Sequence, residues 1–166
     1  MRAVHKTFAT ILLFFAVGST GCNRNRVSAS SIEGQIGRAI GVRCPKTSDC
    51  RIRLRDVTSF DWDKMFYFAY EVRPAGREQV VGIPLETAEF RRQLVFLRGG
   101  RIVRNDLLPT DIEGPIENEI DFQLGNQPDQ WITCDSEAQF TATRGDGGTG
   151  TGIVFFQLKS MSDHCR

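Results

Sequence analysis

The sequence predicts an α+β fold, built from an antiparallel β-sheet with one or two short helices and stapled by disulfides. Short apolar or alternating segments recur from residue 51 to residue 158, and turn-forming residues separate them. A stretch that begins at Ser31 has apolar side chains at helical spacing. Four of the five cysteines lie between residues 44 and 165, which suits two bridges within one domain.

The predicted helix opens the domain. Its apolar positions share one face: Ile32, Ile36, Ala39 and Ile40. Ser30 or Ser31 is the expected N-cap, and Gly41 is the expected stop. The helix is therefore amphipathic and three turns long at most.

Strands are predicted at residues 51–55, 60–70, 92–98, 101–104, 130–134, 139–143 and 152–158. Residues 51–55 alternate strictly, with Ile52 and Leu54 inward. Residues 60–70 carry apolar side chains on both faces, with Trp62 and Phe66 on the same one, which predicts a central strand. Gly99-Gly100 supplies a tight hairpin turn, and 139–143 with 152–158 form a second hairpin. Residues 106–128 are expected to be loop with at most one short element.

The cysteines other than Cys22 are Cys44, Cys50, Cys134 and Cys165. They permit three pairings, and locality favours Cys44 with Cys50 and Cys134 with Cys165. The second bridge would close a loop of about 30 residues and stabilise the fold by roughly 3 to 4 kcal/mol.

The N-terminus has the layout of an export signal. A short basic region precedes the apolar run 7–17, which is too short to span a bilayer as a permanent helix. Residues 18–22, Gly-Ser-Thr-Gly-Cys, resemble the lipobox of bacterial lipoproteins, in which the cysteine is diacylated and becomes the new N-terminus. Ser19 stands where that family usually has an aliphatic residue. The alternative is an ordinary cut after Gly18, which would release a soluble periplasmic protein.

Cysteine number favours the lipoprotein interpretation, because an odd cysteine in an oxidising compartment would leave a loose thiol. The expected organisation is a signal peptide at 1–21, a flexible tether at 22–30 and one globular domain at 31–166. Two acyl chains on Cys22 would hold the protein on a bilayer stably. The resemblance also implies that a residue other than Asp after the cysteine permits transfer to the periplasmic face of the outer membrane. Here that residue is Asn23.

Charge gives no support to nucleic-acid binding. Removing 21 residues from 166 leaves 145, and without Arg2 and Lys6 the balance is 19 basic against 20 acidic residues. A basic stretch, Arg91, Arg92, Arg98, Arg101 and Arg104, precedes an acidic one, Asp106, Asp111, Glu113, Glu117, Glu119 and Asp121. Two solvated faces are the expected outcome, and a bipolar surface that steers a charged partner is the alternative.

Residues 50–68 carry the motif Phe60-Asp-Trp-Asp-Lys followed by an apolar-aromatic run. With the later apolar strand, glycine turn and second strand, this stretch resembles small uncharacterised bacterial lipoproteins over residues 50–104. The resemblance implies the compartment and the fold, and it carries no assigned activity.

Candidate chemistry is sparse. The mature chain has one histidine, His164, beside Cys165 near the C-terminus, which favours neither a nucleophilic triad nor a metal site. Asp61 and Asp63 share one face beside Trp62, so they suit either acid/base work or a cap at the start of the strand. Neither a cofactor nor a metal is expected.

One face of the predicted strand at residues 51–55 carries three alternating arginines, Arg51, Arg53 and Arg55. They could bind phosphate and carboxylate groups of envelope polymers, or they could be solvated charges that protect a sheet edge. The sequence therefore predicts a non-enzymatic, membrane-anchored binding module for an envelope protein or polymer. An inhibitor or immunity protein against a periplasmic toxin or hydrolase is one form of it. The alternatives are a structural or assembly lipoprotein of an envelope complex and a hydrolase that uses Asp61 and Asp63.

Overall fold

The computed structural model describes residues 31–44, 49–108, 119–124, 130–146, 154–161 and 163–166. The predicted signal segment, Cys22 and the tether lie outside the described residues. The elements in chain order are α1 (Ile32–Arg43), β1 (Cys50–Arg53), the 3-10 helix η1 (Leu54–Asp56), β2 (Lys64–Phe68), α2 (Pro74–Val81), β3 (Arg92–Arg98), β4 (Arg101–Leu108), β5 (Glu119–Gln123), β6 (Trp131–Asp135), β7 (Gln139–Asp146) and β8 (Val154–Ser160).

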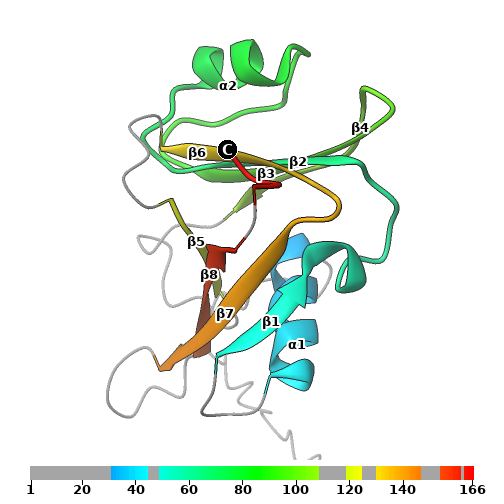
Figure 1. Ribbon diagram of the computed structural model, residues 1–166. Helices are drawn as coiled ribbons and strands as arrows, with labels where there is room; N and C mark the ends of the chain where they lie inside the picture. Colours follow the sequence, from blue (N-terminus) through cyan, green and yellow to red (C-terminus); the bar gives the residue numbers. More distant parts are fainter. Residues whose placement is uncertain (1–30, 45–48, 109–118, 125–129, 147–153, 162) are drawn as a thin grey trace, which may run out of the picture.

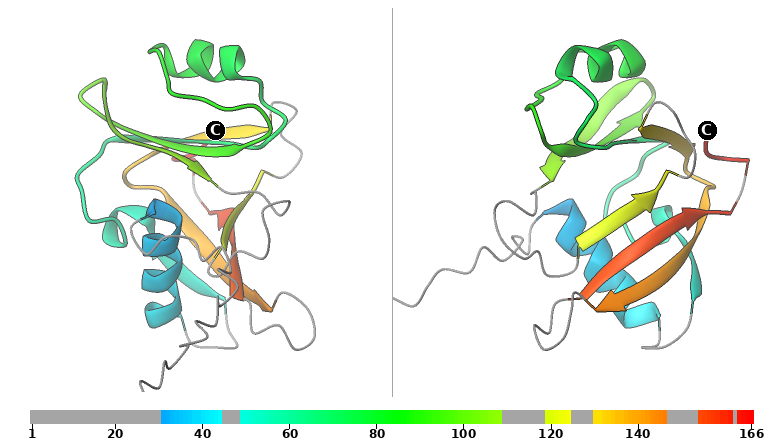
Figure 2. Two further views of the ribbon diagram at one scale, coloured as in Figure 1. Left: turned by 180° about the vertical axis from the view of Figure 1, so that it is seen from behind. Right: turned by 90° about the vertical axis from the view of Figure 1, so that its left-hand side faces the viewer.

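The predicted α+β class is confirmed, and the strands divide into two sheets. Sheet A has the order β1-β7-β8-β5, and sheet B has the order β4-β3-β2-β6. Every pairing in sheet B is antiparallel, whereas in sheet A β5 runs parallel to β8. Helix α2 lies on the outer face of sheet B, and α1 lies against sheet A (Figures 1 and 2).

The main core fills the space between α1, sheet A and the inner face of sheet B. Its fully buried side chains include Ile36, Ile40, Met65, Phe96, Phe140 and Phe156. A smaller cluster packs between sheet B and α2, and consists of Phe66, Phe68, Leu85, Val95 and Leu97. Sheet B is thus apolar on both faces, which explains the continuous apolar runs of its central strands.

Strand β2 is central in sheet B, as predicted, because it lies between β3 and β6. The strand begins only at Lys64, however, and Trp62 precedes it. Trp62 packs edge-on against Phe96 in the main core with ring centroids 5.2 Å apart, whereas Phe66 faces α2. The prediction that Trp62 and Phe66 share one strand face is therefore wrong, since strand alternation does not extend back to Trp62.

Helix α1 starts as predicted, because the Ser31 side chain accepts a hydrogen bond from the Gly34 N–H at 3.1 Å. It continues past Gly41 to Arg43. The strand predicted at residues 51–55 is cut short, since β1 ends at Arg53 and the chain turns into η1. In that turn the Leu54 carbonyl accepts the N–H groups of the two residues that follow η1.

Both predicted hairpins are present. Gly99 and Gly100 join β3 to β4 with φ angles of 56° and 74°, which glycine adopts without steric cost. Strand β7 pairs with β8 in antiparallel register. Strand β4 extends to Leu108, and β5 lies within the stretch expected to be loop, of which 109–118 and 125–128 lie outside the described residues.

Both disulfides follow the favoured pairing, Cys44 with Cys50 and Cys134 with Cys165. The second bridge places the C-terminal residues along the outer edge of β6. There Thr133 and Arg166 exchange two backbone hydrogen bonds of 2.9 and 3.0 Å. The tail therefore covers backbone groups that an edge strand would otherwise present to solvent.

Candidate functional site

An exposed group of charged side chains joins three segments that are far apart in the sequence. It consists of Arg53, Arg55, Asp56, Asp135, Glu137 and His164, and we call it the ionic cluster. Glu137 lies in the turn between β6 and β7. Arg53 ends β1 and pairs in register with Gln139 of β7. That register brings the Glu137 side chain to the end of β1.

Glu137 bridges two of the arginines predicted as a binding surface. Its carboxylate accepts hydrogen bonds from Arg53 Nη1 at 3.1 Å and from Arg55 Nη1 at 3.3 Å. Arg53 also donates from Nη2 to Asp56 Oδ1 at 3.0 Å, and this contact raises the pKa of Arg53 above its ordinary value. These side chains are 40–51% exposed. Ion pairs this exposed add about 0 to 1 kcal/mol, so the fold does not depend on them.

Asp135 and His164 form the other half of the ionic cluster. The Nδ1 atom of His164 lies 2.8 Å from Asp135 Oδ2, and Asp135 Oδ1 accepts the Glu137 N–H at 2.8 Å. The hydrogen bond between the two side chains lowers the pKa of Asp135 and raises that of His164. Within the described residues, the side chain that bonds to the His164 ring is that of Asp135.

Asp61 and Asp63 instead contact the β3–β4 hairpin. Asp61 pairs with Arg98 at 3.1 Å, and Asp63 Oδ2 accepts the Gly99 N–H at 2.6 Å. The Asp63 N–H donates to the Leu97 carbonyl at 2.8 Å. Asp63 therefore accepts a backbone N–H, as in the capping role weighed in the sequence, whereas Asp61 contacts a side chain of the hairpin in an exposed ion pair.

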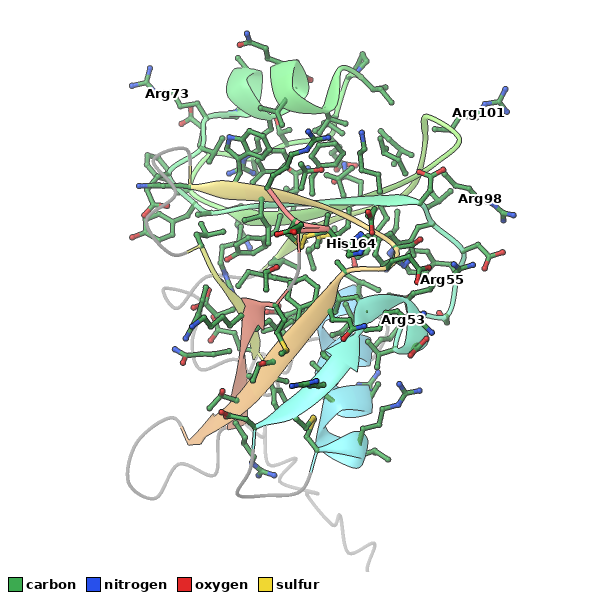
Figure 3. All side chains as sticks on the ribbon, viewed as in Figure 1. Arg53, Arg55, Arg73, Arg98, Arg101 and His164 are labelled. Carbon is green, nitrogen blue, oxygen red and sulfur yellow. A yellow bond between two sulfur atoms is a disulfide. The ribbon has the colours of Figure 1, made fainter. Side chains whose placement is uncertain are left out.

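The remaining predicted arginine, Arg51, is exposed on β1 opposite Thr141 and has no ion pair among the residues that the structure describes. Figure 3 shows Arg98, Arg55 and Arg53 along the right-hand side of that view, with Arg73 at the upper left. Arg53 and Arg55 are partly exposed, and both pair with acidic side chains that the sequence did not indicate.

A second polar group lies inside the protein and was missed by the sequence reasoning. We call it the buried cluster, and it consists of Glu33 of α1, Tyr67 of β2, Arg92 of β3, and Glu119 and Asp121 of β5. Glu33 is 0% exposed and Arg92 is 7% exposed. The expectation that the basic stretch forms a solvated face is wrong for Arg92, because a local pattern does not reveal a partner 59 residues away.

Comparisons with known protein families, with curated proteins and with solved structures find no match for this chain. No helix in the described part of the chain is long and apolar enough to cross a membrane. The described residues also contain no group of three His, Cys, Asp or Glu side chains placed to hold a metal ion.

Proposed function

We propose that the mature chain is a lipid-anchored binding module of the bacterial cell envelope, and that it contacts an envelope protein or polymer through the ionic cluster. The observation that carries this proposal is the convergence of three separate segments on one exposed, charged surface. The anchor rests on the lipobox resemblance around Cys22. It is supported by the pairing of the other four cysteines, which leaves Cys22 outside both bridges.

The ionic cluster suits selective contact because its charges are held in place. Arg53 and Asp135 are each the last residue of a paired strand, β1 and β6. His164 is fixed through its own carbonyl, which accepts the Asp135 N–H at 3.0 Å. Fixed charges of both signs steer encounter and reject partners with the wrong pattern more than they add affinity. A partner with a complementary charge pattern, such as a toxin or hydrolase that the module inhibits, fits this surface.

The surface can be tested by capture from envelope extract with matched charge reversals. The wild-type chain should retain one stoichiometric partner at low salt and lose it as salt is raised. The double change Arg53→Glu and Arg55→Glu should lower recovery at least about tenfold, since it opposes the steering charges. Arg73→Glu is the control, because Arg73 is an exposed arginine before α2 and outside the ionic cluster. Equal recovery with all three proteins would place the contact elsewhere, and a blank with the wild-type protein would rule out a protein partner and leave only an envelope polymer as the ligand.

Fractionation of cells that express the wild-type chain or Cys22→Ser tests the lipid anchor. Wild-type protein should fractionate with membranes and carry a diacylated Cys22 at its N-terminus, whereas Cys22→Ser should leave the membrane fraction. A soluble wild-type protein that begins at Ser19 would instead show the ordinary cut after Gly18.

A further inference from the structure

We propose that Glu33 is a pH-sensitive clasp between helix α1 and both sheets, in which the neutral carboxyl keeps the contact closed and the ionised carboxylate loosens it. The inference rests on the buried cluster and is independent of the proposed binding function.

The hydrogen bonding of the Glu33 carboxyl group favours its neutral form. Its Oε1 atom accepts the Ile120 N–H of β5 at 3.0 Å and a longer bond from Arg92 Nη2 of β3 at 3.4 Å. Its Oε2 atom is buried without a partner among the described residues. A carboxylate with one oxygen desolvated and unbonded is costly, and a proton on that oxygen removes the charge without breaking the bond to Ile120.

One guanidinium, that of Arg92, contacts two carboxylates. Arg92 lies 2.8 Å from Glu119 Oε1, closer than it lies to Glu33, and also donates to the Ile120 carbonyl at 2.9 Å. A neutral Glu33 therefore leaves Arg92 with a charged partner. An ionised Glu33 adds a second negative charge beside Glu119, in a place with little water to screen it.

The other charged groups around this site do not compensate Glu33. On β2, burial raises the pKa of Tyr67, which stays neutral and donates to Asp121 of β5 at 3.4 Å. On β4, Asp106 accepts the Ile32 N–H at 2.8 Å at the start of α1 and is itself paired with Arg104. Helix α1 thus keeps one attachment to sheet B whatever the state of Glu33, so the loosening is confined to its contact with β5 and β3.

The direction of the effect follows from the same geometry. Burial raises the pKa of Glu33 to about 7 against the opposing charge of Arg92, so ionisation falls in the neutral range. The folded state then binds more protons than the unfolded state, and its stability falls as pH rises from the ordinary glutamate pKa through the raised one. Between pH 5.5 and pH 8.5 this single group should lower the folding equilibrium constant about 30-fold.

The test compares the full chain with Glu33→Gln and with the exposed control Glu71→Gln. Guanidinium unfolding at pH 5.5 and 8.5 should show a change in the folding equilibrium constant that is about 30-fold larger in wild type and in E71Q than in E33Q, because the contribution of His164 is common to all three proteins. Hydrogen exchange at the Ile120 amide, corrected for the intrinsic pH dependence, should speed up with pH in the first two proteins only. Equal pH slopes in all three proteins would overturn the proposal.

A second measurement decides the matter if E33Q does not fold. The side-chain carboxyl carbon of Glu33 in wild-type protein should titrate by NMR with a midpoint near neutral pH. A midpoint below about pH 5.5, close to that of an ordinary glutamate, would overturn the clasp.

Discussion

Removing the Cys134–Cys165 bridge should destabilise the protein more than removing the Cys44–Cys50 bridge. The two bridges join residues 31 and 6 positions apart. Cross-linking a longer loop removes more entropy from the unfolded chain, and the loop-closure relation gives about 3 to 4 kcal/mol for the long loop and about 2 kcal/mol for the short one. The expected difference in unfolding free energy is therefore about 1.5 kcal/mol.

The two bridges form a matched pair for this comparison. Cys134 is 2% exposed and Cys44 is 4% exposed, while each of their partners is half-buried. Alanine replacements should therefore leave cavities of similar size. Freeing Cys165 also weakens the backbone bonds between Thr133 and the C-terminal residue, which adds to the cost of losing the long bridge.

The assay is guanidinium unfolding of C134A/C165A, C44A/C50A and wild type. The dependence of the unfolding free energy on denaturant concentration is compared first, because a shift in midpoint measures stability only where this slope is unchanged. Hydrogen exchange at the Thr133 amide should speed up in the first variant and not in the second. An equal cost for the two variants, or a larger cost for C44A/C50A, would refute the loop-closure reasoning.

Two further outcomes are expected. Gly100→Ala should lower the free energy of unfolding by about 1 kcal/mol, because Gly100 has a φ of 74°, which alanine adopts only with strain. An added Cβ would meet nothing within 4 Å, so the whole cost is conformational. An unchanged thermal unfolding midpoint would contradict this. Asp135→Asn should lower the NMR titration midpoint of His164, because the hydrogen bond between the two side chains raises the pKa of His164. Stabilisation by the pair should fade as pH rises through the pKa of His164 and as pH falls through that of Asp135. A midpoint that Asp135→Asn leaves in place would show that the pair does not couple.

Local patterns predicted the elements whose determinants lie within a few residues. The Ser31 cap and the isoleucine spacing of α1 are complete within three turns, and the hairpin at Gly99 depends only on its own φ angles. Helix α2 has local start and stop signals that the sequence interpretation did not use. Pro74 stands at its first position, and Gly82 ends it in the left-handed region. The helix has few apolar residues, so it shows no hydrophobic periodicity in the sequence.

Elements that depend on distant partners were beyond local reasoning. Strand β5 offers only Ile120 and Phe122 as inward residues, and its partner in sheet A is a parallel strand more than 30 positions away. The burial of Glu33 likewise depends on Arg92 and on the β5 backbone, which no spacing in α1 reveals. Charged residues were assigned to solvent by type, and that assignment holds for Arg55 but not for Arg92.

The same Coulomb interaction therefore has opposite consequences at the two charged sites. In the ionic cluster water screens Glu137 and its arginines, so their charges can be reversed with little effect on stability, and a loss of capture in R53E/R55E reports on contact rather than on folding. In the buried cluster Glu33 is fully buried, so water does not screen its charge, and its charge state changes how α1 holds β5 and β3. A pH dependence of binding that persists in E33Q points to groups such as the exposed pair of Asp135 and His164 or to the partner, whereas one that disappears in E33Q acts through α1.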